Sequence, residues 1–106
     1  MPYIITKMQY PSHQQFEIVK TWVKIRDKYP EKEDLAVQLC APVTTNENGI
    51  VVMAIYDVKE GQLEKALTYW SSFLYEYISV EGYEYTIRVW STFDEALAIA
   101  GIERPE

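Results

Sequence analysis

Runs of β-branched and aromatic residues predict four strands along the chain. They are expected at residues 3–9, 35–45, 50–57 and 83–90, each bounded by turn-forming residues. In the third strand both alternating sets of side chains are apolar, which is typical of a strand covered on both faces. Pro42 interrupts the second strand and favours the edge of a sheet, because proline has no N–H for the strand ladder.

Apolar residues at helical spacing predict two long helices between these strands. The first is expected over residues 12–29, because Ser12 and Gln15 have the spacing of a capping box and Pro30 cannot continue a helix. The second is expected over residues 61–79, where apolar and polar residues fill opposite halves of a helical wheel. Each helix therefore has one face to bury.

The order of these elements predicts the topology. A short third helix is expected over residues 93–100, between a capping box at Thr92 and Glu95 and a glycine. The order is then β-α-β-β-α-β plus a terminal helix, the ferredoxin-like pattern of an α+β protein with a four-stranded antiparallel sheet. The turn at residues 46–49, which ends in an Asn-Gly pair, predicts a hairpin between the second and third strands. A single domain, residues 1–106, accounts for the whole chain.

One face of the predicted sheet has no cover. Both long helices pack on the same face in this topology, yet both alternating sets of the third strand are apolar: residues 50, 52, 54 and 56 on one face, and residues 51, 53 and 55 on the other. The apolar arc of the first helix, which includes Trp22, is also wider than packing on one sheet requires. We therefore expect a homodimer whose sheets stack face to face, in a dimeric α/β barrel or a higher oligomer. The alternative is that the terminal helix, or the region 30–48, folds over the bare face.

The composition narrows the possible functions. Ten Lys and Arg against sixteen Asp and Glu give a net charge of −6, which argues against a nucleic-acid partner. The single cysteine, Cys40, permits neither an internal disulfide nor a multi-cysteine metal site, and we expect it to be a small buried apolar residue. The longest apolar run, residues 50–56, is too short to span a membrane, and no signal peptide is visible. A cytoplasmic protein without a membrane partner is expected.

Two segments carry a family resemblance: IYDVKEGQLE (residues 55–64), where a strand runs into a helix, and VWSTFDEA (residues 89–96), at the end of the last strand. The chain resembles the dimeric α/β-barrel superfamily, whose best-known branch is the antibiotic-biosynthesis monooxygenase-like group. The resemblance implies a cleft between helices and sheet that takes small, often aromatic, molecules. The resemblance does not identify catalytic residues in this chain. Ala66 stands one turn before Trp70, where quinone-oxidising members have Asn, and the only histidine is His13, whereas haem-degrading members use one on the second helix.

Aromatic and basic residues are the candidates for a ligand site. Tyrosine hydroxyls that converge in an apolar cleft would suit a phenol or quinone-like ligand. Arg26 interrupts the apolar arc of the first helix, so it either reaches solvent, pairs with a carboxylate or anchors an anion. On the fourth strand, Glu84 and Arg88 share one face, either as an edge ion pair or as a polar pocket lining. The candidate ligand-binding residues are Arg26, Tyr56, Tyr69, Trp70, Phe73, Tyr77, Tyr85 and Arg88.

Three classes of function stay open at this point. The chain is a binder of a small apolar or aromatic molecule, a cofactor-independent monooxygenase or isomerase, or a non-enzymatic assembly or accessory subunit. A pocket that contains a titratable group with a shifted pKa would favour the enzyme, and a pocket without such a group would favour the binder. A filled core with no pocket would favour the assembly subunit. We expect His13 to be exposed at a helix start. We expect no metal site, because no second His or Cys is spaced to bind a metal together with His13. No cofactor is expected either.

Overall fold

The structure is a computed structural model that describes residues 1–105. Over this part of the chain it combines three α-helices with an antiparallel sheet of five strands, so the predicted mixed α+β fold is confirmed. The elements are β1 (Tyr3–Tyr10), η1 (Ser12–Gln14, a turn of 3-10 helix), α1 (Gln15–Ile25), β2 (Ala36–Cys40), β3 (Val43–Asn46), β4 (Gly49–Val58), α2 (Leu63–Tyr75), β5 (Glu84–Trp90) and α3 (Phe93–Ile99).

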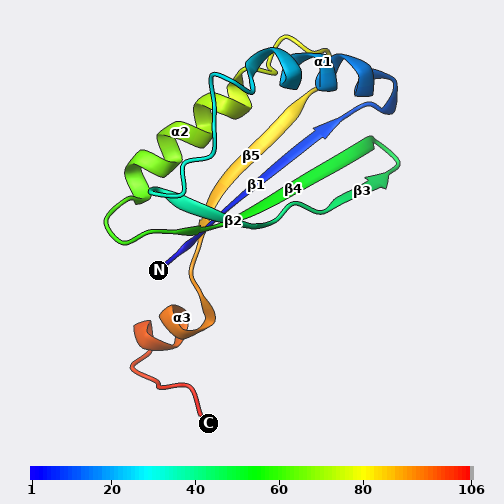
Figure 1. Cartoon of the computed structure of the whole chain (residues 1–106). Coiled ribbons are helices and arrows are strands. Elements are labelled where there is room, and N and C mark those ends of the chain that lie inside the picture. Colours follow the sequence, from blue (N-terminus) through cyan, green and yellow to red (C-terminus); the bar gives the residue numbers. More distant parts are fainter. Residues whose placement is uncertain (106) are drawn as a thin grey trace.

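The strands lie in the order β2-β4-β1-β5, and β3 also pairs with β4 (Figure 1). The prediction of four strands is wrong, because residues 35–45 form two strands, β2 and β3, both antiparallel to β4. Pro42 separates them, since it has no N–H to donate, although its carbonyl still accepts a bond of 2.9 Å from the N–H of Met53. The register of β2 also shifts between Gln38 and Cys40.

The predicted hairpin between β3 and β4 is confirmed. Asn46 pairs with Gly49, and the side-chain oxygen of Asn46 accepts a hydrogen bond of 2.8 Å from the N–H of Asn48. Gly49 has a φ of +127°, and a Cβ at this position would collide with the carbonyl oxygen of Tyr10 and lie 2.9 Å from the Cα of Pro11. The hairpin therefore meets the end of β1 at a point where only glycine fits.

The first helix is shorter than predicted. The capping box expected at Ser12 does not form, and neither η1 nor α1 starts with a side-chain cap. The side-chain oxygen of Gln15 instead accepts a hydrogen bond of 2.5 Å from the hydroxyl of Tyr10. α1 ends at Ile25, and the chain leaves it through a turn at residues 26–28.

The other two helices follow the sequence more closely. α2 ends at Tyr75 rather than near residue 79, because the N–H groups beyond it bond three residues back, as from Ile78 to the carbonyl of Tyr75 at 3.0 Å. The capping box predicted for α3 is confirmed. The hydroxyl of Thr92 accepts from the N–H of Glu95 at 3.2 Å, and the carboxylate of Glu95 accepts from the N–H of Thr92 at 2.7 Å.

The core lies between the sheet and its two long helices (Figure 1). One set of alternating side chains on β1, which includes Ile4 and Met8, faces the helices and lies opposite Tyr56 and Val52 of β4. Two clusters of buried side chains fill this layer. The first contains Met8, Tyr10, Ile18, Ile25, Leu74, Tyr77, Val80 and Tyr83. The second contains Ile4, Ala36, Ala54, Tyr56, Val58, Ala66 and Trp70.

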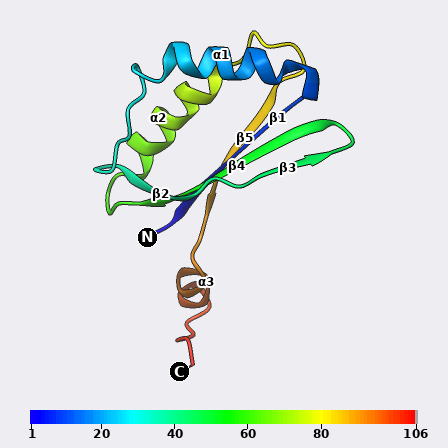
Figure 2. The same ribbon diagram turned by 45° about the vertical axis from the view of Figure 1, so that its right-hand side comes forward.

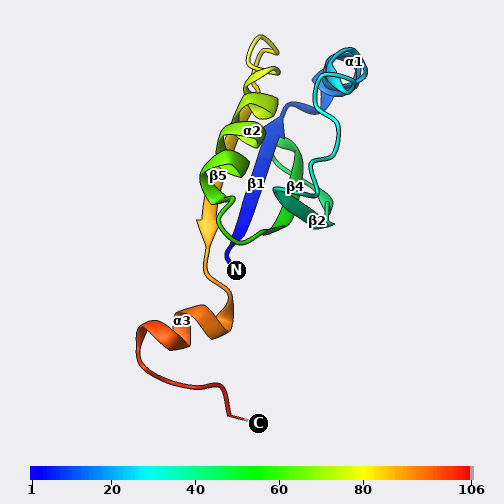
Figure 3. The ribbon, with the colours of Figure 1, turned by 60° about the vertical axis from the view of Figure 1, so that its left-hand side comes forward.

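The second face of the sheet has no helix over it among residues 1–105 (Figures 2 and 3). β2 and β3 lie within the sheet, and α3 extends away from it without burying any of its residues, so the expected alternative of a folded-over cover is wrong. The radius of gyration is 15.7 Å, against about 13 Å for a compact chain of this length. The accessible surface is 7401 Å², against roughly 6,100 Å² for a monomeric protein of 12.4 kDa.

We predict that Gly49→Ala destabilises the protein by more than about 2 kcal/mol, because the new Cβ collides with the carbonyl of Tyr10 and the φ is unfavourable for alanine. Urea unfolding followed by circular dichroism measures the loss. Gly61→Ala is the matched control: its φ is +74° but nothing lies within 4 Å of the Cβ that alanine would add, so it should cost only about 1 kcal/mol. Equal losses for the two variants would contradict the steric argument.

Candidate functional site

A cavity lies between α1, α2 and the sheet and has two adjoining chambers. The polar chamber, of about 460 Å³, is bounded by Arg26 and by residues 31–33 of the loop before β2. The apolar chamber, of about 260 Å³, is bounded by side chains of β1 and β4, among them Thr6 and Ala54. Both chambers share a wall formed by Trp22, Gln38, Tyr56, Trp70 and Phe73.

The shared wall belongs to a continuous series of aromatic rings. The ring centroids of Tyr56 and Trp70 lie 4.5 Å apart, and Trp70 meets Tyr69 edge-on at 5.0 Å. Tyr29 then packs edge-on against both Tyr69 and Phe73, each at 5.6 Å. Three of these rings come from α2, where spacings of three and four residues place them on one face of the helix. Flat, apolar surfaces therefore line the cavity.

The tyrosines at the cavity are neutral hydrogen-bonding groups. Burial raises the pKa of Tyr56 to about 12, and the indole N–H of Trp70 only partly offsets this effect. Burial likewise raises the pKa of Tyr77 and of Tyr69. Because all three hydroxyls stay protonated at neutral pH, they can donate a hydrogen bond but cannot act as general bases.

Two residues that carry hydroxyl groups line the apolar chamber. Thr6 is 4% exposed and, apart from tyrosines, is the only buried polar side chain in residues 1–105. Tyr77, which is 1% exposed, lines the same chamber. The hydroxyl of Tyr69, by contrast, donates to the carbonyl of Pro30, which fastens the loop before β2 to α2 at the rim of the polar chamber.

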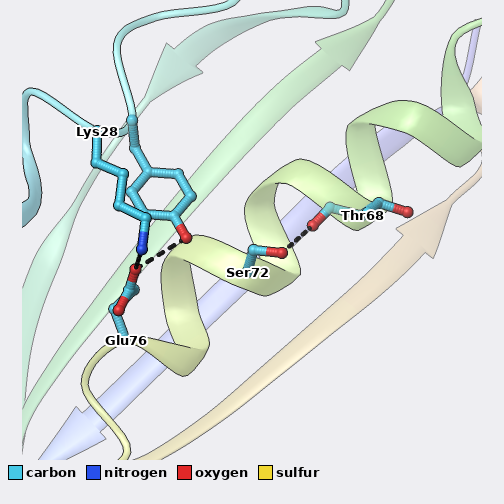
Figure 4. Close-up of polar contacts among 5 residues, drawn as sticks. Lys28, Thr68, Ser72 and Glu76 are labelled. Carbon is cyan, nitrogen blue, oxygen red and sulfur yellow. Dashed lines mark hydrogen bonds and ion pairs between the residues drawn. The ribbon is translucent and has the colours of Figure 1, made fainter.

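A polar cluster at the end of α2 holds Tyr29, which lines the polar chamber. Figure 4 shows the contact between Lys28 and Glu76 in this cluster. The carboxylate of Glu76, at the end of α2, accepts 2.8 Å from the ammonium of Lys28 and 3.0 Å from the hydroxyl of Tyr29. These hydrogen bonds lower the pKa of Glu76. The hydrogen bond to Glu76 likewise raises the pKa of Lys28. The same figure shows the hydroxyl of Ser72 donating to the backbone carbonyl of Thr68, a contact within α2.

The structure brings six of the eight candidate residues to the cavity. They are Arg26, Tyr56, Tyr69, Trp70, Phe73 and Tyr77. The other two lie elsewhere on β5. Tyr85 stacks on Tyr83 at 5.7 Å, and Arg88 lies opposite Ile5 on the face of the sheet without helices. Because β5 and β2 are at opposite edges of the sheet and the cavity lies toward β2, residues of β5 do not reach it.

Most other residues that line the cavity were not among the candidates, and Thr6, Gln38 and Trp22 are the ones with side chains suited to a ligand. Thr6 and Gln38 are polar residues in strands, and nothing in the local pattern distinguishes them from exposed strand residues. Trp22 belongs to the apolar arc of α1. Its helical spacing with other apolar residues predicted packing rather than a ligand site. The guanidinium of Arg26 lies 5.7 Å from the centroid of the Trp22 ring, so the two side chains form one rim of the polar chamber.

Two other sequence expectations have clear outcomes. Cys40 is exposed, so the prediction of a buried apolar residue is wrong; it lies at an edge strand, next to the register shift that follows Gln38. His13 is exposed in η1, at the start of the first helix, as predicted. Within residues 1–105, no three His, Cys, Asp or Glu side chains are placed to hold a metal ion together. In the same range, no helix has the length and hydrophobicity needed to cross a bilayer.

Comparison with known proteins gave no relative: no protein-family model, no curated protein and no solved structure matches the chain. The resemblance of residues 55–64 and 89–96 to the dimeric α/β-barrel superfamily therefore stays a prediction. The case for a function depends on the cavity itself.

We predict that Glu76→Gln lowers the melting temperature at neutral pH, because Lys28 and Tyr29 lose their charged acceptor. The pKa of Glu76 is lowered in the folded state, so its stabilisation is present above the carboxyl's ordinary pKa and is lost as the pH falls through the folded value. Melting curves from pH 7 to about pH 3 should therefore converge for the two proteins. Glu84→Gln, on exposed β5, is the control. A constant difference at all pH values would show that charge is not the cause.

Proposed function

We propose that this protein binds a small apolar or aromatic molecule in the cavity between α1, α2 and the sheet. The observation that carries the proposal is the wall shared by the two chambers, in which Tyr56, Trp70 and Phe73 present aromatic surface to both sides. The polar chamber, about 460 Å³, has the size of ordinary ligand pockets, and the apolar chamber extends it toward the sheet. A core that served only assembly would need no such space.

The chemistry of the walls indicates the kind of ligand. An aromatic ring would lie in the apolar chamber, against Trp70 and Ala54. A ligand oxygen would find neutral donors there in the hydroxyls of Thr6 and Tyr77. The amide of Gln38 lies on the shared wall and offers both a donor and an acceptor. A phenol or a quinone-like molecule fits this arrangement.

The pKa values support binding rather than acid–base catalysis. An efficient general base has a pKa near the working pH. Burial moves the pKa of Tyr56 to about 12 and raises that of Tyr77, which is away from that range. Both hydroxyls are thus suited to recognise a ligand oxygen and not to take a proton from it.

The same proposal includes a homodimer of ferredoxin-like subunits, with the two sheets stacked through their uncovered faces as in a dimeric α/β barrel. The strand order β2-β4-β1-β5, with both long helices on one face, supports the subunit topology. The uncovered face carries Ile5, Met53 and Ile55 in neighbouring positions of β1 and β4. The accessible surface exceeds the value for a compact monomer by roughly 1,300 Å², which is more than the ~800 Å² that each partner buries in a standard interface.

The ligand proposal is tested by an NMR titration with 1-naphthol, read at the indole N–H of Trp70 and the methyl groups of the apolar chamber. We expect saturable shifts there and none at Trp90, which lies on β5 away from the cavity. Ala54→Leu fills the apolar chamber and should weaken binding about tenfold. Ala98→Leu, on the exposed side of α3, should leave it unchanged.

Two further variants test the role of the hydroxyls in the same titration. Thr6→Val and Tyr77→Phe each remove one hydroxyl and keep the shape of the side chain, so each should weaken 1-naphthol by about two- to tenfold. Naphthalene has no oxygen, and its affinity should not change in either variant. Absence of shifts with both probes, or equal affinity in wild type and Ala54→Leu, would overturn the proposed binding site.

The dimer is tested by native mass spectrometry. Wild type should give a dimer at micromolar concentration, and Ile55→Lys should give a monomer, because a charge would be buried at the centre of the stacked sheets. Glu47→Gln changes the net charge by the same amount in the exposed hairpin and should stay dimeric. A monomeric wild type, or a dimeric Ile55→Lys, would overturn the sheet pairing while leaving the ligand proposal intact.

A further inference from the structure

The sequence specifies α3 strongly at both of its ends. Its N-terminus has the complete capping box of Thr92 and Glu95. Its C-terminus is a Schellman motif, in which Gly101 adopts a φ of +73° and the N–H of Ile102 bonds to the carbonyl of Leu97 at 2.9 Å. Both sets of end groups are thus satisfied within a helix of only seven residues.

This helix nevertheless packs against no other helix or strand of its own chain, and the guanidinium of Arg104, 5.0 Å from the centroid of the Phe93 ring, covers only part of its apolar surface. None of its residues is buried, with Phe93 63% and Ile99 84% exposed. All three ribbon views place α3 apart from the sheet and from the other helices (Figures 1, 2 and 3). So short a helix is not stable in water from capping and propensity alone, and its apolar arc therefore needs a partner surface.

α1 has a matching unpartnered surface. It buries Ile18 and Ile25 against the core, while Phe16 and Val23 form an apolar stripe on its outer side. Val19, which is half-exposed and also lines the apolar chamber, borders this stripe on the side of the sheet. Phe16 is 78% exposed, the highest value in the stripe. At 100° per residue, Lys20 and Lys24 border the stripe on one edge. We call this surface, made by Phe16, Val19, Lys20, Val23 and Lys24, the α1 stripe.

The two surfaces of one chain cannot meet. α3 follows Trp90, which pairs with Tyr3 at one end of β1, whereas α1 follows Tyr10 at the other end. These ends are separated by seven strand steps, or roughly 23 Å. Only residues 91–92 link β5 to α3, so the helix cannot reach α1 while β1 and β5 remain paired.

We propose that α3 of one copy packs on the α1 stripe of a second copy of the chain, and reciprocally. The two copies thus exchange their α3 helices, which we call the arms. The charges are complementary: α3 carries Asp94 and Glu95 in its first turn, and the stripe carries Lys20 and Lys24. In one chain those carboxylates pair with Arg104 and with the terminal amine, but these pairs are largely exposed and exchange readily with solvent. This contact uses the helix-covered side of the second copy, so it is separate from the proposed stacking of the sheets, and it does not depend on the ligand.

Cross-linking between two single-cysteine proteins tests the exchange. In a Cys40→Ser background, Val19→Cys places a thiol in the α1 stripe and Ala96→Cys places one in the apolar arc of α3. After the two proteins are mixed, a short bismaleimide should link the Val19→Cys chain to the Ala96→Cys chain. The matched control is Glu84→Cys on exposed β5, which should give little product with Val19→Cys. The yield should fall at high salt, because the lysines and carboxylates are screened.

Three results would overturn the exchange. One is a yield for positions 19 and 96 no higher than for positions 19 and 84. Another is a double variant, Val19→Cys with Ala96→Cys, that cross-links within single chains. The last is an unchanged yield after Ile99→Asp, which places a charge in the apolar arc. The cross-link tests the exchange of α3 separately from the stacking of the sheets. Ile55→Lys is designed to remove the stacked sheets. A cross-linked product that persists in that variant supports the exchange of α3 independently of the stacking.

Discussion

The pairing of β1 with β4 is the constraint on which the rest of the structure depends. These two strands lie in the middle of the sheet, in register from Tyr3 opposite Asp57 to Tyr10 opposite Ile50. Because side chains alternate along a strand, this register decides at once which residues meet the helices and which form the uncovered face. A slip of one residue would exchange the two sets. It would remove Thr6 and Ala54 from the floor of the cavity.

The cavity lies between a helix that buries few of its residues, α1, and a helix that packs on the sheet along its length, α2. α2 buries Ala66, Trp70 and Leu74 against the sheet, whereas α1 buries only Ile18 and Ile25. The space between them is walled by rings instead of being filled by aliphatic side chains. The hydrogen bonds of Lys28 and Tyr29 to Glu76 hold the chain after α1 beside the end of α2, which fixes the width of the opening. Apolar surface stays exposed on α1, on α3 and on one face of the sheet, and this surface is available for contacts with a second copy of the chain.

Local chemistry explains which parts of the candidate site could be predicted. The aromatic face predicted for residues 61–79 follows from helical periodicity: Tyr69, Trp70 and Phe73 lie on α2, Tyr77 lies just beyond its end, and all four line the cavity. Tyr85 and Arg88 share the same residue types but lie on the far edge strand, and no local pattern shows which edge a cavity will adjoin. Gln38 was missed for the opposite reason, since its role depends on the pairing of β2 with β4 and not on its neighbours in sequence.

The sequence by itself determined the elements that depend on near neighbours. These are the Asn-Gly hairpin, the capping box of α3, the amphipathic α2 and the strand character of β1, β4 and β5, all of which arise from backbone preferences and spacing over a few residues. Only the tertiary structure decided that residues 35–45 divide at Pro42, that Gln15 bonds to Tyr10 instead of capping a helix, and that Cys40 is exposed. Each of these depends on partners distant in the chain or on the register of a sheet edge, and neither is encoded in local periodicity.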